Sequence, residues 1–262
     1  TVGKALALLD IVESFKAPVK FNDILKQSPF PKPSTYRLLQ TLVSQEMLSH
    51  NEDSGHYAIG SRLIRLAHSA WKNASLAPIA APYLDALSNA TGETIHLAKL
   101  DNAQTLYLDK RNARKPIDMF SNAGKIGPAY CTGVGKAMMA YLDGEHLAGV
   151  IAQQSFHVFT EHTLASEQAL RAELLDIRAN GYGFDREEHE PNIICVALPI
   201  LTARGRVLGA LSVTSSTQRT NLGALEMLVP RIQIAAGAIA QESESWRFPD
   251  QTHTQSVETA KG

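Results

Sequence analysis

Apolar residues recur at helical spacing in three stretches of the first 45 residues. The first stretch, residues 2–15, has one wide apolar face, and Pro18 limits it because a proline disfavours helix in the residue before it. A second, shorter helix fits residues 21–28 and is followed by a turn rich in proline. A third helix is expected from about residue 33 to about residue 45, with its leucines on one side.

Two short segments follow the third helix and predict a β-hairpin. They are residues 47–50 and 56–60, and the turn between them contains Asn, Asp and Gly. Helix, helix, turn, helix and hairpin is the order of a winged helix-turn-helix domain, in which the third helix enters the major groove and the hairpin tip touches the neighbouring backbone. A small helical module that docks on protein has the same order. The order alone leaves both functions open.

The outward side of the third helix favours the nucleic-acid interpretation. It presents hydroxyl, amide, phenol and basic groups, which can bond phosphate oxygens or base edges, and it has no carboxylate before Glu46. Residues 1–73 carry nine basic and six acidic side chains, a net of +3, whereas the rest of the chain has a net of −4. We therefore predict that this face binds double-stranded DNA. The residues expected to contact it are Lys32, Ser34, Thr35, Tyr36, Arg37 and Gln40.

Hairpins alternate with helices in the remainder, which predicts an α+β domain with a largely antiparallel sheet. We expect the DNA-binding domain at residues 1–60, a linker helix at 61–75, a second domain at 76–246 and a polar tail at 247–262. The elements expected in the second domain are a helix ending at Gly92, strands at 94–100, 105–111, 117–121, 194–201 and 206–214, a helix between Ser166 and Gly181 with Leu170, Leu174, Leu175 and Ile177 inward, and a long final helix at 222–242.

The composition is that of an ordinary globular protein, with 44% hydrophobic and 19% charged residues. No stretch approaches 18 apolar residues and charges interrupt the first 15, so we expect neither a membrane span nor a secretory signal. The two cysteines, Cys131 and Cys195, cannot form a disulfide framework, and neither CxxC nor HExxH occurs. These features indicate a cytoplasmic chain without a metal site or a cofactor.

Several polar residues of the second domain are candidates for ligand binding. Ser212 and Thr214 are two residues apart on an expected strand and share one face, where two interior hydroxyls need partners that a ligand can supply. Asp185 follows a Gly-Tyr-Gly turn and can accept a ligand hydroxyl. The glycines that begin at Gly133 free backbone N–H groups at a helix start, although the segment matches neither phosphate-loop pattern. Backbone-bonded hydroxyls, a turn-capping aspartate and a tight packing turn explain the same residues without a ligand.

An enzyme is an alternative class. A thiol nucleophile needs a histidine beside it, but His189 and Cys195 are six residues apart around Pro191, and no side chain is clearly placed to orient the histidine. Ser212 lies outside any GxSxG motif, and the histidines are scattered. We therefore expect no catalytic residue.

The order of several motifs resembles the IclR family of bacterial transcription regulators. The motifs are KALALLDIV, PKPSTYRLLQTLVSQ, GHYAIGSRLIRLAH, TGETIHLAKLD, IGPAYCTGVGKAMMAYL, LRAELLDIRANGYGFDREEHEPNIICVALPI and GALSVT. The resemblance extends from Val2 to Glu242. It implies a winged-helix domain, a linker helix and a GAF-like effector-binding domain, in homodimers that often pair into tetramers on an operator. It also implies that the effector is a small organic acid.

The resemblance implies an effector site as well. The residues it assigns are Met119 in an apolar wall, Gly133 and Val134 in contact with the effector, and Asp185, Cys195, Ser212 and Thr214 in the lining. The chain departs from the family at Pro31, where a side-chain cap is usual, so Ser28 or solvent must replace that cap. The prediction is a DNA-binding regulator whose operator affinity is switched by a small acid. A sensor that acts through protein–protein contacts instead of DNA is the alternative.

Overall fold

The computed structural model describes residues 1–74 and 76–245. The chain divides into two compact units, residues 1–73 and the residues from 74 onward. The polar tail expected at 247–262 lies outside the described residues. Within the described ranges, no helix is long and apolar enough to cross a membrane.

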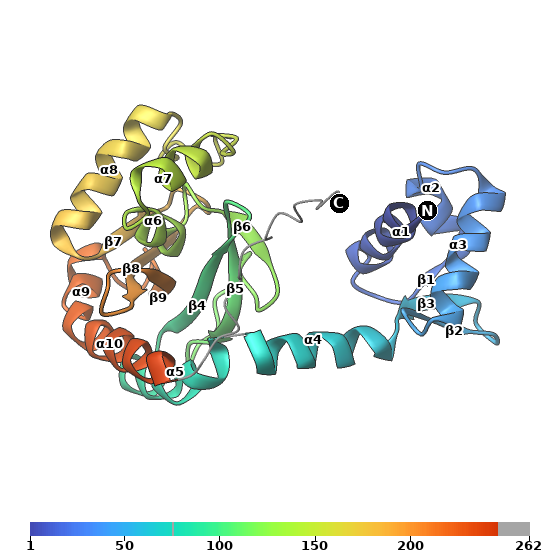
Figure 1. Ribbon diagram of the computed structural model, residues 1–262, viewed down its shortest axis with the longest axis horizontal. Helices are drawn as coiled ribbons and strands as arrows, with labels where there is room; N and C mark the ends of the chain where they lie inside the picture. The colour runs from blue at the N-terminus through green and yellow to red at the C-terminus, as the bar shows by residue number, and fades with distance from the viewer. Residues whose placement is uncertain (75, 246–262) are drawn as a thin grey trace, which may run out of the picture. The chain divides into compact units, whose positions relative to one another are not determined.

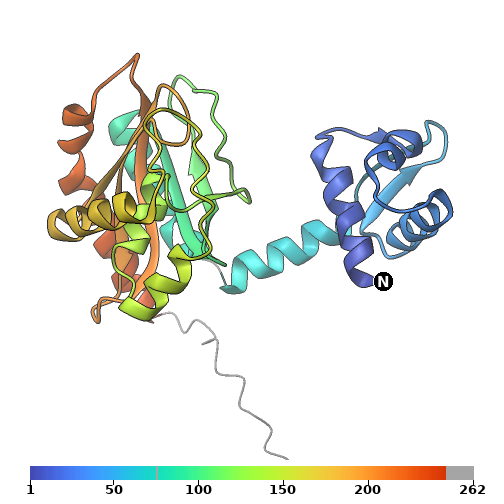
Figure 2. The same ribbon diagram turned by 90° about the horizontal axis from the view of Figure 1, so that it is seen from above.

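The first unit consists of helices and a small antiparallel sheet (Figure 1; Figure 2). Its elements are α1 (Val2–Ser14), β1 (Val19–Lys20), α2 (Phe21–Gln27), α3 (Lys32–Ser44), β2 (Leu48–Asn51), β3 (His56–Ile59) and α4 (Ser61–Ala74). Strand β3 pairs with β2 as the expected hairpin and with the unexpected β1, whose two residues are too short to show an alternating pattern. Buried side chains of α1, α2, α3 and the sheet form one core, which includes Leu8, Ile24, Leu39 and Tyr57.

The second unit is built on one six-stranded sheet in which each pair of neighbours is antiparallel, in the order β6-β5-β4-β9-β8-β7. Its elements are α5 (Ala77–Thr91), β4 (Thr94–Asp101), β5 (Gln104–Arg111), β6 (Ile126–Pro128), α6 (Gly133–Met139), α7 (Gly144–Ile151), α8 (Glu167–Asn180), β7 (Gly183–Arg186), β8 (Ile193–Leu201), β9 (Val207–Ser216), α9 (Leu222–Glu226) and α10 (Val229–Ser245). Helices α5 and α10 cover one face and α6 and α8 lie on the other (Figure 1). The predicted α+β class with an antiparallel sheet is confirmed.

The strand predicted at residues 117–121 is wrong. This segment belongs to the loop between β5 and β6, and the edge strand is formed by residues 126–128 instead. Its backbone is bonded by side chains rather than by a neighbouring strand, since the Phe120 N–H donates to both carboxylate oxygens of Glu190 at 2.9 and 3.0 Å. Alternation of apolar and polar residues cannot show whether the backbone groups of a segment are hydrogen-bonded by a neighbouring strand or by side chains.

Two helical predictions also need correction. Leu175 is 70% exposed, because the buried stripe of α8 follows Leu170, Leu174 and Ile177 and Leu175 lies outside it. The long helix expected at 222–242 is two helices, α9 and α10, with a break after Glu226. Pro230, the second residue of α10, has no N–H to donate to the Glu226 carbonyl, which favours a helix start here over a continuous helix.

Candidate functional site

The outward side of α3 forms the first candidate site. Four of the six residues predicted to contact DNA have exposed side chains, and Ser34 is half-buried; the exposed four are Lys32, Tyr36, Arg37 and Gln40. Within the described residues the Arg37 guanidinium forms no ion pair. A free guanidinium among polar neutral groups is suited to bind phosphate or a guanine edge.

The prediction for Thr35 is wrong, because its side chain is completely buried. Its hydroxyl donates to the Phe30 carbonyl at 3.1 Å and lies 2.9 Å from the Ser28 hydroxyl. The Pro31 carbonyl accepts the Ser34 and Thr35 N–H groups, and no side chain caps α3. Ser28 and Thr35 therefore hold the turn between α2 and α3, so the hydroxyl of Thr35 has a structural role.

The hairpin packs against α3 at its base. Burial raises the pKa of Tyr57 on β3, and a hydrogen bond from Gln40 opposes this rise, so the predicted base reader Gln40 also contacts the hairpin. The hairpin tip carries Glu52 and Asp53, both exposed. These carboxylates repel phosphate and so oppose the backbone contact expected for the hairpin tip.

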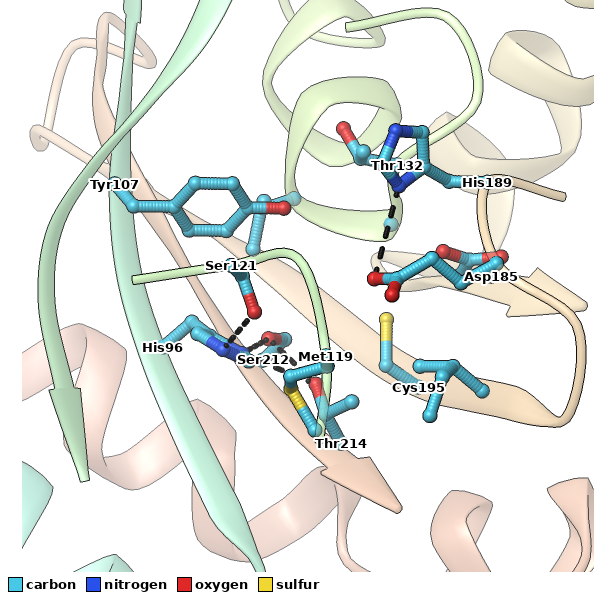
Figure 3. Close-up of a pocket in the computed structure, with 14 residues that line it drawn as sticks. His96, Tyr107, Met119, Ser121, Thr132, Asp185, His189, Cys195, Ser212 and Thr214 are labelled. Carbon is cyan, nitrogen blue, oxygen red and sulfur yellow. Dashed lines mark hydrogen bonds and ion pairs between the residues drawn. The ribbon is translucent and has the colours of Figure 1, made fainter. Parts of the chain in front are cut away.

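The second unit contains a cavity between its sheet and the start of α6 (Figure 3). All seven residues predicted for the effector site line it: Met119, Gly133, Val134, Asp185, Cys195, Ser212 and Thr214. The lining residues that the sequence did not point to are His96, Tyr107, Ser121, Thr132, His189, Glu190 and Ile193. The cavity volume is about 30 Å³, which is room for about two waters.

Strand register brings most of the predicted residues together. Asp185 on β7 is paired with Cys195 on β8, which is paired with Thr214 on β9, so the three form one row across the sheet. Ser212 lies on the same face, two residues along β9, and is paired with His96 on β4. Sequence spacing indicated the shared face of Ser212 and Thr214, but only the register shows which strands lie beside them.

Gly133 begins α6 directly against the sheet. A Cβ at this position would overlap the Cys195 sulfur, and a Cβ at Gly135 would overlap the Ala129 carbonyl oxygen. Close packing therefore requires both glycines. The packing explanation and the lining of the cavity are compatible, since the same close approach places the Gly133 backbone at the cavity wall.

His96 organises the hydroxyl groups of the cavity (Figure 3). Its Nδ1 lies 3.2 Å from both the Ser212 and the Thr214 hydroxyl, and its Nε2 lies 2.8 Å from the Ser121 hydroxyl. Burial, together with the charge of Lys110, lowers the pKa of His96 to about 3, so the imidazole is neutral at physiological pH. The hydroxyls that needed partners thus find one in His96, which no motif had singled out.

Asp185 and Cys195 differ sharply in what they can do. Burial raises the pKa of Asp185 to about 7, and the charge of Glu188 adds to the rise. Burial likewise raises the pKa of the Cys195 thiol, which is the opposite of what a nucleophile needs. No group of three metal-ligating side chains occurs among the described residues. The geometry therefore suits reversible binding and gives no support to thiol chemistry.

The loop between β5 and β6 closes one side of the cavity. The Phe120 N–H is held by Glu190, and the Phe120 ring lies edge-on to His189, with 5.1 Å between ring centroids. The Lys110 ammonium donates to the Ser121 carbonyl at 2.6 Å. These contacts hold Met119 and Ser121 in place in the cavity wall.

Comparison with known proteins matches both units to two family models. Residues 1–52 match the IclR helix-turn-helix domain, and residues 68–241 match the C-terminal domain of the bacterial transcriptional regulator IclR. The HTH-type transcriptional regulator XynR of Escherichia coli is 30% identical over 241 residues, which cover 92% of this chain and 96% of that protein.

Solved structures show the same fold. The crystal structure of IclR from Thermotoga maritima superposes with a TM-score of 0.77 at 24% identity, covering 92% of this chain and 97% of the other. An IclR homologue from Microbacterium hydrocarbonoxydans, solved in complex with 4-hydroxybenzoate, superposes with a TM-score of 0.80 at 20% identity, covering 93% and 99%.

Proposed function

Because this chain belongs to the IclR family of bacterial transcription regulators, and is a DNA-binding regulator with an effector-binding C-terminal domain, we propose that a small organic acid in the Asp185–Cys195 cavity switches its affinity for an operator. The proposed active form is a homodimer or a pair of homodimers. The proposed effector contacts are the seven residues predicted from the sequence.

The single observation that supports this most is the cavity itself. It gathers a buried carboxyl group, a row of hydroxyls around a neutral imidazole and an apolar wall at Met119. Ligand sites commonly combine apolar walls with a few convergent polar groups in this way. The complex of the Microbacterium hydrocarbonoxydans homologue with 4-hydroxybenzoate is consistent with an acid ligand in this fold.

The small volume of the cavity supports a switch rather than a passive site. A volume of about 30 Å³ is smaller than an organic acid, so we infer that binding is coupled to movement of the groups that line the cavity. A ligand that binds only the opened state shifts the population toward it. In a dimer such a shift can change the spacing of two winged helices, which must match half-sites about 34 Å apart or a multiple of that distance.

The proposed DNA contacts are made by α3, through Lys32, Ser34, Tyr36, Arg37 and Gln40. Their support is the exposed polar face and the unpaired Arg37 guanidinium. Thr35 is left out because its side chain is buried.

An electrophoretic mobility shift with the DNA upstream of the chain's own gene tests the DNA face. We expect Arg37→Ala to weaken binding and to reduce the salt slope by about one, because one phosphate or base contact is lost. Lys26→Ala is the matched control, since Lys26 is an exposed cation already paired with Asp23 on α2. Equal affinity and equal salt slope for Arg37→Ala and wild type would contradict the assignment of α3.

Native mass spectrometry of protein purified from cells tests the ligand. We expect a bound small acid that is released on unfolding and lost in a variant with a filled cavity. If the protein binds no DNA but retains the acid, a sensor acting through protein–protein contacts becomes the better account.

A further inference from the structure

The charged groups buried beside the cavity do not balance. Lys136 on α6 is fully buried, and its ammonium binds Glu188 as well as Glu173, the latter at 3.2 Å. Arg186 forms a second ion pair with Glu173 at 2.8 Å. Two cations therefore face three carboxyl groups, because Asp185 belongs to the same cluster.

Asp185 is the carboxyl group without a cation. It is 7% exposed, it accepts the Glu188 N–H at 2.8 Å, and it takes part in no ion pair within the described residues. The Oε2 atom of Glu188 is buried as well and has no hydrogen-bond donor in the described part of the chain. The cluster thus has more buried hydrogen-bond acceptors than donors. One added proton turns an acceptor into a donor and removes the excess negative charge.

The surrounding groups place that proton on Asp185. Burial, with the charges of Glu188 and Glu190 and against the opposing charge of Lys136, raises its pKa to about 7. Burial also raises the pKa of Glu188, but the Lys136 ammonium opposes this rise through its charge and its hydrogen bond, whereas Asp185 forms no such ion pair within the described residues.

The remaining titratable groups of the cavity wall add neither a lysine nor an arginine. Burial raises the pKa values of Cys131, Cys195 and Tyr107, which stay neutral at physiological pH. His189 lies in the lining 3.8 Å from Glu190. Among the described lining residues there is no Lys and no Arg, so an anion entering the cavity meets carboxyl groups without a permanent counter-ion.

We propose that the cavity binds its acid as a carboxyl–carboxylate pair, in which protonated Asp185 donates a hydrogen bond to the ligand carboxylate. This inference rests on the proposed function and narrows its ligand class. Because Asp185 offers one proton and the described lining contains no lysine or arginine, the cavity accepts a ligand with one negative charge and rejects a dianion. Asp185 is therefore the residue that selects effectors by their charge.

The proton makes binding dependent on pH in a defined direction. Below about pH 7 Asp185 already carries its proton, so the affinity for a monoanion is constant. Above pH 7 Asp185 is ionised and must take up a proton when the anion binds, so the affinity falls tenfold for each pH unit.

Infrared spectroscopy of the full chain, with ¹³C-labelled aspartate, tests the proton without any ligand. We expect one protonated aspartate carbonyl band at pH 6 that titrates near pH 7 and is absent from Asp185→Asn. Glu190→Gln, which changes the other carboxyl group in the lining, should retain the band. A wild-type spectrum without a protonated aspartate at pH 6 overturns the proposal, and this reading does not depend on whether the variant folds.

Calorimetry with glycolate and oxalate tests the charge selection. We expect glycolate to bind with uptake of nearly one proton at pH 8 and almost none at pH 6, and oxalate, a dianion of similar size, to bind at least tenfold more weakly. Glycolate binding without proton uptake at pH 8, or equal affinity for oxalate, overturns the proposal while leaving an acid effector in place. If the infrared band is present but glycolate does not bind at pH 6, the charge-selection proposal fails, while the acid effector of the proposed function is tested separately by native mass spectrometry.

Discussion

Lys136→Met gives the sharpest prediction about the groups beside the cavity. Methionine keeps most of the length and apolar volume of the side chain but removes the ammonium. Glu188, which is 2% exposed, then stays buried without its counter-ion. Breaking one partner of a buried ion pair costs about 3–5 kcal/mol, so we expect the free energy of unfolding to fall by that amount.

A double variant distinguishes the cost of leaving Glu188 buried without a counter-ion from the cost of losing the Lys136–Glu188 attraction itself. Replacing both charges, as in Lys136→Met with Glu188→Met, removes the uncompensated carboxylate, so we expect recovery of about 2 kcal/mol or more relative to the single variant. Arg171→Met is the control, because it breaks an exposed i,i+4 pair with Glu167 and should cost less than about 1 kcal/mol.

Urea unfolding of the full chain at pH 7, followed by circular dichroism, measures these differences. The reasoning is refuted if Lys136→Met unfolds at the wild-type midpoint. It is refuted equally if the double variant is as unstable as the sum of the two single variants.

Three further predictions concern packing and protonation. Gly133→Ala should destabilise the chain by about 1–3 kcal/mol, because the new methyl group overlaps the Cys195 sulfur, and Cys195→Ala in the same chain should relieve part of this in thermal unfolding; additive losses would argue against the overlap. Thr35→Val should cost about 1–2 kcal/mol through its two lost hydrogen bonds yet leave the salt slope of DNA binding unchanged, and a changed slope in a mobility-shift titration would restore Thr35 as a DNA contact. Because the folded-state pKa of His96 is lowered to about 3, the unfolded chain binds a proton first, and stability should fall by up to about 1.4 kcal/mol per unit as pH drops from 6 towards 3. Acid unfolding of His96→Gln should lack this contribution, and identical pH profiles for the two chains would contradict it.

The sequence predicted best where local chemistry decides the structure. The cap of α8 is an example, since Ser166 accepts the Ala169 N–H and Gly181 ends the helix with a positive φ of 83°. Pro230 removes a helical donor near the break between α9 and α10, but α5 continues through Pro82, so a proline in the sequence does not by itself predict where a helix ends. The exposure of Leu175 could not have been predicted. It lies next to the apolar stripe of α8, and only the packing of the helix decides how wide a stripe is buried.

The candidate site shows the same division. The common face of Ser212 and Thr214 follows from strand periodicity alone. His96 lies 116 residues before Ser212 and meets it only through the pairing of β4 with β9, which no local pattern encodes. The burial of Thr35 depends on a contact with Ser28 across the turn, which the helical pattern of α3 does not encode, so its place among the expected DNA contacts could be corrected only from the structure.

Operator affinity measured by fluorescence anisotropy, with and without the acid recovered from the purified protein, tests the central claim most directly. The pair to compare is the wild type and Ser212→Val, which fills part of the cavity without touching α3. We expect the acid to change the wild-type Kd by about 5- to 150-fold, as is typical of allosteric coupling, and to leave the Kd of Ser212→Val nearly unchanged while both proteins bind DNA equally in its absence. An unchanged wild-type Kd at saturating acid, or the same shift in Ser212→Val, would contradict the account.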